Sequence, residues 1–358
     1  MVTESVAPGA NAAPRTKPCR VTVAGGESFE VNKDDLLLKA AIEQGIEYPH
    51  NCRVGVCGAC KTRLVRGKVS PMVDLALSPL TNQQLKDGYF LACQAKVRTD
   101  IEIEARMGHH QQLPVETVSS TVSFWKRRPG DVVELRLKLD APLRFHAGQY
   151  ATIARSGSFV RRHYSIYDAP PEGGGGATEI GFLIKRLPGG RFSPWLFEAD
   201  RTGTKFWVEG PFGVMEVDDV DRDGLCVAGG TGLAPILSIV GDRLRRSKTA
   251  RFTIVLGVRG SGDRFAEDHL ERLSALAPGR VRVLTVLSHE PAGSSWNGPR
   301  GLVTDALGPD LGIDFRSVAS FTCGNLAMVD AVESRLATLG VLPQRMHADR
   351  FVPSGTQG

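Results

Sequence analysis

The sequence has no run of about 18 consecutive apolar residues, the length that a membrane-spanning helix requires. Its net charge is also low, because +5 over 358 residues leaves no basic excess of the kind that nucleic-acid-binding proteins carry. Residues 1–17 are rich in Ala and Pro and lack the apolar core of a secretory signal, so we expect a disordered tail there. We therefore expect a cytoplasmic monomer that has neither a membrane nor a nucleic acid as a partner.

Cysteine is sparse, and four of the seven cysteines follow a distinctive spacing. Cys52, Cys57 and Cys60 are arranged as C-x4-C-x2-C, and Cys93 lies downstream in Leu-Ala-Cys-Gln. The sequence lacks the two paired ligand sets of a structural zinc site, and a disulfide framework would need an oxidising compartment. Three ligands of a small cluster must come from one tight loop, in which Gly55 lets the backbone turn through positive φ. The spacing predicts a [2Fe–2S] cluster held by these four thiolates.

The residues around these cysteines resemble the plant-type ferredoxin family. The resemblance rests on residues 49–60, 67–69 and 91–94, and it covers most of residues 18–107. It implies a small β-grasp domain of the α+β class that holds the cluster. Apolar periodicity indicates, in order, a hairpin, a helix, a strand, a short helix and a closing strand. We expect these elements over residues 20–31, 36–45, 62–65, 82–86 and 100–104.

Basic residues are concentrated near the predicted cluster loop. Between Asn51 and Lys68 the sequence has no acidic residue and five basic ones, namely Arg53, Lys61, Arg63, Arg66 and Lys68. One interpretation is a solvated basic face. The other is a surface near Arg53, Lys61, Arg63 and Arg66 that docks an acidic electron-transfer partner.

The rest of the chain changes pattern twice. Residues 108–115 are polar and predict a linker. Short strands separated by turns over residues 116–218 predict an antiparallel β-barrel, whose four-glycine turn lacks the Lys-Ser/Thr of a P-loop. Strands alternating with helices over residues 219–340 predict an α/β domain with a parallel sheet, including a short element at 303–307. Residues 341–358 are expected to form a C-terminal tail.

Four segments of the predicted barrel region resemble the ferredoxin–NAD(P)⁺ reductase superfamily when they are taken in order. They are Phe145–Tyr150, Arg161–Ser165, Gly189–Ser193 and Gly210–Gly213, and the resemblance covers residues 116–351. It implies that the barrel binds FAD.

The resemblance also gives roles to particular residues. Tyr164 would lie against the isoalloxazine, Ser165 near its N5, and Arg162 at the pyrophosphate. An anion site ahead of a helix would come from Gly189, Gly190 and Ser193. The alternative makes Tyr164 a core aromatic residue and Arg162 a surface charge.

A glycine-rich turn opens the predicted α/β domain. It comprises Gly229, Gly230, Thr231 and Gly232, follows an apolar strand, and leads into a helix with Pro235 in its first turn. Such a turn lets a dinucleotide pyrophosphate approach the helix N-terminus, although a plain strand-to-helix turn is the alternative.

Two further segments match the superfamily. Residues 322–328 resemble its Cys-Gly-Pro-Pro-x-Met segment, with Asn325 and Leu326 at the proline positions. The match implies that Cys323 lies beside the nicotinamide and helps to position it, and an inert buried cysteine is the alternative. Ala-Asp-Arg-Phe at 348–351 resembles the terminal acidic-x-aromatic signature. It implies that the tail returns to the flavin and that Phe351 stacks on it, and a surface anchor is the alternative.

The sequence leaves the choice of nicotinamide nucleotide to a loop that contains both charge signs. After residues 252–257 come Arg259, Asp263 and Arg264. An acid there favours the ribose 2′-OH of NADH, whereas an arginine such as Arg259 accommodates the 2′-phosphate of NADPH. We expect NADH, because the domain order resembles NADH-using oxygenase reductases.

The whole domain order resembles the reductase components of multicomponent aromatic-ring oxygenases. It implies an NADH-dependent iron–sulfur flavoprotein that serves a terminal Rieske-type oxygenase, with Ser165, Cys323 and Phe351 at the hydride-transfer site. The reductase of a di-iron monooxygenase would have the same motifs and stays open as an alternative. A redox-sensing module is a third interpretation, but no DNA-binding or output segment accompanies it.

Overall fold

The structure is a computed structural model that describes residues 17–50, 55, 60–71, 80, 82–105, 107, 113–213, 215 and 219–351. The chain divides into two compact units, Met1–His109 and His110–Gly358. Residues 1–16 of the expected tail and 108–112 of the expected linker lie outside the described residues. No helix in the described ranges is both long and apolar enough to cross a bilayer.

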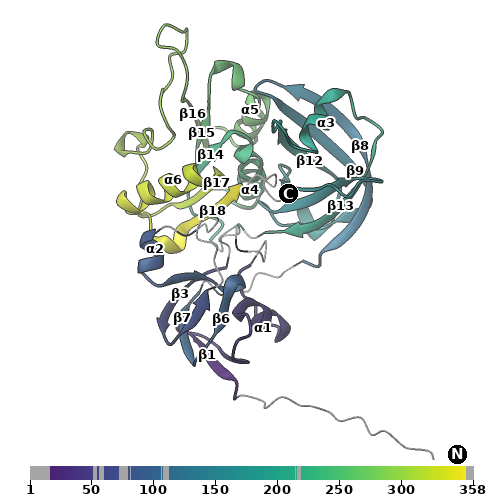
Figure 1. The fold of residues 1–358 in the computed structure, drawn as a ribbon. Coiled ribbons are helices and arrows are strands. Elements are labelled where there is room, and N and C mark those ends of the chain that lie inside the picture. The colour runs from purple at the N-terminus through teal and green to yellow at the C-terminus, as the bar shows by residue number, and fades with distance from the viewer. Residues whose placement is uncertain are drawn as a thin grey trace, which may run out of the picture. The chain divides into compact units, whose positions relative to one another are not determined.

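The N-terminal unit is a mixed sheet with a helix against it (Figure 1). The strand order is β2-β1-β7-β3-β5, in which only the β1–β7 pair is parallel. Side chains of the sheet and of α1 share one core, in which Val21, Leu37 and Ile103 are fully buried or nearly so. This is the predicted β-grasp arrangement. Its elements are β1 (Cys19–Val23), β2 (Ser28–Val31), α1 (Leu37–Glu43), β3 (Lys61–Arg66), β4 (Val69–Pro71), α2 (Asn82–Lys86), β5 (Tyr89–Leu91), η1 (Ala92–Gln94), β6 (Ala95–Val97) and β7 (Ile101–Glu104).

The first half of the C-terminal unit is an antiparallel half-barrel with strand order β11-β10-β13-β8-β9-β12. Every second residue along β9 enters the core, including Leu135 and Leu137, because strand side chains alternate between the two faces. The expected four-glycine surface turn is exposed, with a short η2 (Glu172–Gly174). The other elements are β8 (Glu116–Arg128), β9 (Val132–Leu143), β10 (Tyr150–Arg155), β11 (Arg161–Ser165), β12 (Ala177–Lys185), α3 (Ser193–Glu198) and β13 (Lys205–Phe212).

The second half of the C-terminal unit is a parallel five-stranded sheet with order β16-β15-β14-β17-β18. Successive residues of β14 point to opposite faces, so Cys226 packs with α4 and α5 while Leu225 packs with α6. The strand order reverses between β14 and β17, and ligands of such sheets bind at the carboxyl ends there. The elements are β14 (Gly224–Gly229), η3 (Gly230–Gly232), α4 (Leu233–Arg246), β15 (Phe252–Val258), η4 (Ser261–Asp263), α5 (Glu267–Leu276), β16 (Val281–Leu287), η5 (Pro309–Leu311), β17 (Ala319–Asn325), α6 (Leu326–Thr338), η6 (Pro343–Arg345) and β18 (Met346–Phe351).

Two sequence expectations need correction. Residues 303–307 form hydrogen-bonded turns and no helix or strand, although Val303 and Leu307 are buried as their apolar character requires. Residues 346–351, expected within a tail, form the edge strand β18, which pairs in parallel with β17 from Ser320↔Met346 to Asn325↔Phe351. Met-His-Ala-Asp-Arg-Phe has no clear apolar alternation, so its strand conformation depends on pairing with β17. Residues 352–358 lie outside the described part.

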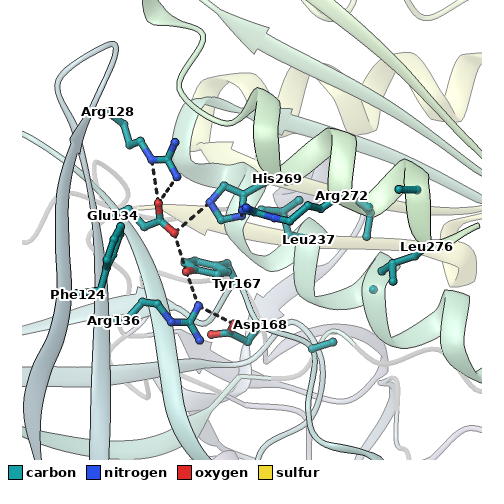
Figure 2. A pocket seen from close by; sticks show the side chains of 14 residues that line it. Phe124, Arg128, Glu134, Arg136, Tyr167, Asp168, Leu237, His269, Arg272 and Leu276 are labelled. Carbon is teal, nitrogen blue, oxygen red and sulfur yellow. Dashed lines mark hydrogen bonds and ion pairs between the residues drawn. The ribbon is translucent and has the colours of Figure 1, made fainter.

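Barrel and parallel sheet meet at a polar joint beside a pocket of about 730 Å³ (Figure 2). Glu134 of β9 accepts hydrogen bonds from Arg128 and from Tyr167, whose hydroxyl lies 2.9 Å away, and its Oε1 is 3.3 Å from Nε2 of His269 on α5. Burial alone would raise the pKa of Glu134, but the His269 and Arg128 interactions lower it to about 2. The carboxylate is therefore ionised at neutral pH and links the two halves of this unit.

Candidate functional site

Cys60 and Cys93 lie close together in the N-terminal unit, although 33 positions separate them in the sequence. Cys60 directly precedes β3, Cys93 lies in η1, and both are buried. The backbone N–H of Ala92, next to Cys93, donates to the carbonyl of Cys60 over 3.1 Å. Pairing of β3 with β5 sets this approach, since Lys61 stands opposite Leu91.

The cluster loop reaches the same place through Gly55. Gly55 has φ of +88°, and a Cβ on it would lie 2.7 Å from Cγ of Gln94. Gln94 is next to Cys93 in η1, so the loop backbone at Gly55 passes beside the fourth predicted ligand. Cys52 and Cys57 lie outside the described residues, and in the described part no three His, Cys, Asp or Glu residues form a metal site. The contacts of Cys60, Gly55 and Cys93 fit a cluster held between the loop and η1.

The basic surface predicted near the cluster is compensated across strands. Arg63 of β3 stands opposite Glu104 of β7, and their side chains pair at 3.2 Å. Arg66 stands opposite Glu102 in the same register. The local sequence asymmetry is therefore not a surface excess at these two positions. Lys61, next to Cys60, lies over the ring of Tyr89 at 5.9 Å, and Arg53 lies outside the described residues.

The predicted flavin residues occupy β11 in alternation. Arg162 and Tyr164 are half-buried, whereas Ser165 is buried. The ring of Tyr164 packs against Phe182 and Phe192, with centroid distances of 6.4 and 5.9 Å. Burial raises the pKa of Tyr164, so its hydroxyl stays neutral. A half-buried ring held by two aromatic neighbours fits the flat apolar wall that an isoalloxazine requires.

The Gly189–Ser193 segment lies beside Tyr164, because Phe192 of this segment packs against the Tyr164 ring. Gly189 adopts φ of +74°, and no atom lies within 4 Å of a Cβ built there. The hydroxyl of Ser193 accepts the N–H of Leu187 at 2.9 Å, which closes the turn ahead of α3. Ser193 therefore shapes this loop, while Gly189 leaves room at its surface.

The glycine-rich turn at the carboxyl end of β14 packs against the end of β17. A Cβ on Gly232 would lie 2.2 Å from the carbonyl oxygen of Cys323, so no larger residue fits without movement. Gly229 precedes η3, which begins at Gly230, and Pro235 occupies the first turn of α4 as predicted. Asn325 caps α6 by accepting the N–H of Met328 at 3.0 Å, so it starts a helix where the superfamily usually has proline.

Three groups from three strands converge where the barrel meets the parallel sheet. Ser165 of β11 hydrogen-bonds through its hydroxyl to the carboxyl of Asp349 on β18. Asp349 stands opposite Cys323 of β17 in the parallel register, and its backbone N–H hydrogen-bonds to the thiol. Burial raises the pKa of Cys323 well above its usual range, with Asp349 adding to the shift, so the thiol stays protonated. The arrangement suits positioning rather than nucleophilic attack.

The sequence pattern alone gives Asp349 no role, although Asp349 is the acidic position of the terminal acidic-x-aromatic signature. Burial raises its pKa to about 6, and the partly opposing influences are Arg350 and the Ser165 hydrogen bond. Arg350 itself is buried and pairs with Asp330 and Glu333. Phe351, two residues beyond Asp349, is half-buried at the end of β18. The acidic-x-aromatic pattern is the sequence signal that points to Asp349. The contact between Asp349 and Ser165 depends on the fold and cannot be seen in the sequence.

Arg259 lies apart from these three groups, beyond the end of β15. Its side chain is exposed, and its carbonyl accepts the N–H of His289 at 2.7 Å. Arg264 pairs with Glu267 and lies over the ring of Trp296 at 5.1 Å. Of the two arginines considered for a 2′-phosphate, Arg264 is thus already engaged.

Three domain families match successive parts of the chain. The "2Fe-2S iron-sulfur cluster binding domain" matches residues 21–98, the "oxidoreductase FAD-binding domain" residues 121–217, and the "oxidoreductase NAD-binding domain" residues 226–334. The matches follow the β-grasp fold, the half-barrel and the parallel sheet.

Curated relatives match this chain along nearly their whole length. The chain is 36% identical to the xylene/toluene monooxygenase electron transfer component of Pseudomonas putida, over 92% of this chain and 93% of that protein. It is 34% identical to the ferredoxin–NAD(P)⁺ reductase component of the naphthalene 1,2-dioxygenase/salicylate 5-hydroxylase systems of a Ralstonia species, over 89% and 94%. The solved Amycolatopsis cytochrome P450 reductase GcoB superposes with a TM-score of 0.69 at 29% identity, over 94% of this chain and 99% of that chain.

Proposed function

Because this chain belongs to the family of iron–sulfur flavoprotein reductases that serve multicomponent oxygenases, we propose that it carries electrons from NADH to an aromatic-hydrocarbon oxygenase. FAD, when bound, accepts the two electrons of a hydride together and releases them singly, and the [2Fe–2S] cluster passes single electrons outward. The chain would thereby match a two-electron donor to a one-electron acceptor.

The observation that carries this proposal is the convergence of Ser165, Asp349 and Cys323. Ser165 comes from the half-barrel, whereas Asp349 and Cys323 come from the carboxyl end of the parallel sheet. A flavin on the barrel and a nicotinamide on the sheet would therefore face each other at these groups. Proximity of this kind is the main requirement of hydride transfer, since no proton has to be moved to the reacting carbon.

The chain's own residues would then hold and orient the two ring systems. Tyr164 offers its ring to one face of the isoalloxazine, and Arg162 of the same strand offers a planar fork to phosphate. Phe351, from the end of β18, would cover the opposite flavin face until nicotinamide displaces it. The neutral thiol of Cys323 would limit how deeply the nicotinamide enters. Gly232 packs tightly against the carbonyl of Cys323 and would hold this residue in place.

The oxygenase would receive electrons at the N-terminal unit, near Cys60 and Cys93. Lys61 directly follows Cys60, one of the predicted cluster ligands. Arg63 pairs with Glu104, and Arg66 stands opposite Glu102 in the strand register. We centre the expected docking surface on Lys61 because it is the basic residue adjacent to a predicted ligand. Small charged contacts suit the brief encounters of electron transfer.

Two acceptor classes are candidates. A hydrocarbon monooxygenase is supported by the 36% identity with the xylene/toluene system component. A Rieske-type dioxygenase, expected from the motifs, is supported by the 34% identity with the naphthalene system component. Both acceptors need the same one-electron supply.

The test combines the purified reductase and NADH with an oxygenase component. One mixture contains the oxygenase of a toluene-type monooxygenase, and a second contains that of a naphthalene-type dioxygenase. Metal analysis should find about two irons and two acid-labile sulfides per chain. With one oxygenase class, hydroxylated product should form at least about tenfold faster than in the same mixture without the reductase. A tenfold difference in rate corresponds to about 1.4 kcal/mol in the activation barrier. Zinc in place of iron, or no bleaching of flavin by NADH, would sink the proposal.

A further inference from the structure

Beyond the end of β15 a short loop occupies the position where nucleotide-binding sheets meet the adenosine ribose. β14 carries the glycine-rich turn, and β15 is its parallel neighbour, with Gly229 opposite Gly257. In doubly wound sheets the residues after the second strand face the ribose 2′ position. Here those residues are Arg259, Gly260 and Ser261, the last of which begins η4.

A glutamate from the next loop occupies the hydrogen-bond donors of this position. The carboxylate of Glu290 accepts the backbone N–H of Ser261 at 2.7 Å and its hydroxyl at 3.1 Å. A Cβ on Gly260 would lie 3.3 Å from the same carboxylate, so the two loops pack closely. The Ser261 backbone N–H, with the Ser294 hydroxyl and Arg300 nearby, lowers the pKa of Glu290 and keeps it ionised.

Extension of the β15–β16 pairing fixes Glu290 in this place. The N–H of Ser288 donates to the carbonyl of Val258 at 3.0 Å, and that of His289 donates to the carbonyl of Arg259 at 2.7 Å. Glu290 follows directly and is therefore held beside the loop after β15. The backbone position of Glu290 therefore follows from the pairing of the two segments that precede and face it.

Two of the remaining charges at this site, those of Arg259 and Arg300, would favour an anion, whereas Asp263 adds one negative charge. Arg259 is exposed and has no ion pair among the described residues, and Arg300 is close enough to act on Glu290. Asp263 accepts the N–H of Gly260 at 3.1 Å, which occupies a further donor. Without Glu290, the Ser261 donors and two arginines would form a site suited to phosphate.

We propose that Glu290 determines nucleotide specificity by excluding the 2′-phosphate of NADPH from the Ser261 donors. Its carboxylate accepts hydrogen bonds that a phosphate would need and repels a second anion. The ribose 2′-OH of NADH, being neutral and able to donate, meets no such repulsion. This inference rests on the proposed use of a nicotinamide nucleotide and names the residue that selects between its two forms.

The test compares Glu290→Gln with the unmodified protein, because glutamine keeps the shape and removes the charge. Dissociation constants for 5′-AMP and adenosine 2′,5′-bisphosphate, the two adenosine halves, are measured by calorimetry on the holoprotein. We expect the bisphosphate to bind about tenfold more tightly to the variant, with 5′-AMP changed less than about twofold. The ratio of kcat/KM for NADPH to that for NADH should rise in parallel.

Glu271→Gln, on the exposed face of α5, serves as the matched loss of one negative charge elsewhere. It should leave both ratios unchanged. Glu290→Lys should raise the bisphosphate affinity further, and equal ratios in all four proteins would overturn the inference. Failure of the unmodified protein to bind either adenosine nucleotide would instead count against the proposed function.

Discussion

The hydroxyl of Ser165 and the carboxyl of Asp349 are hydrogen-bonded across the boundary between the half-barrel and the parallel sheet. One belongs to β11 and the other to β18, so a single contact joins the flavin side of the site to its nucleotide side. Burial raises the pKa of Asp349 to about 6, and this titration has a measurable consequence.

Replacing Asp349 should change how stability depends on pH. An acid whose pKa rises from 3.8 to about 6 on folding binds protons more tightly when folded, so stability falls as pH rises through that interval. Asp349→Asn removes this loss, and we expect the variant to gain about 3 kcal/mol at most relative to the unmodified protein above pH 6. Calorimetric melting at pH 4 to 8 measures the difference.

The control for this experiment is Asp310→Asn, at an exposed position in η5. Its melting curves should follow those of the unmodified protein at every pH. A constant offset between Asp349→Asn and the unmodified protein from pH 4 to pH 8 would contradict the expected titration.

Loss of a cluster ligand should separate the two halves of electron transfer. Cys93→Ser removes one thiolate. Because Cys93 and the proposed flavin residues lie in different compact units, NADH reduction of an artificial dye should continue. Iron and acid-labile sulfide should be lost, and electron delivery to an oxygenase should fall at least about 100-fold. Cys60→Ser should behave alike; loss of dye reduction in a folded variant of either kind would mean that the division is wrong.

Truncation of Tyr164 should weaken FAD binding. The ring packs between Phe182 and Phe192, so Tyr164→Ala removes the wall on which the isoalloxazine would lie. We expect the FAD dissociation constant to rise about tenfold or more, as flavin fluorescence on titration of the apoprotein would show. Tyr164→Phe keeps the ring and should stay within about twofold, and equal weakening by both would indicate that the hydroxyl carries the contact.

Charge reversal beside the cluster should slow delivery to an acidic oxygenase surface. Lys61→Glu alters the residue next to Cys60, while Lys33→Glu makes the same change at an exposed position after β2. We expect the first to lower the association rate about tenfold and the second to leave it unchanged. Added salt should slow the unmodified protein, since charges act over about 8 Å at physiological ionic strength. An apolar interface would give rates that respond to neither the substitution nor salt.

The sequence was informative where function depends on local geometry. The approach of Cys60 to Cys93 could be predicted because a small cluster forces its ligands together, whatever fold brings them there. The glycine-rich turn was equally predictable, since Gly232 must pass close to Cys323 and a strand-to-helix turn has few solutions. In both cases the chemistry restricts the backbone directly.

Other features depend on contacts between distant segments and could not be predicted in this way. Arg63 and Glu104 are 41 residues apart, and only the β3–β7 register shows that they neutralise each other. The role of Asp349 likewise requires β18 to pair with β17 and to reach β11. Residues 346–351 have little intrinsic strand pattern, so the sheet determines their conformation.

The place of β18 in the chain also has a consequence for biosynthesis. β18 follows every other described element of its unit, yet it carries Asp349 and Phe351. A ribosome-bound chain could fold the half-barrel and four of the five parallel strands before this segment leaves the exit tunnel. Chains released early would then lack Asp349 and Phe351 of the proposed hydride-transfer site. A nascent chain would therefore bring Ser165, Cys323 and Asp349 together only after β18 has been synthesised and has paired with β17.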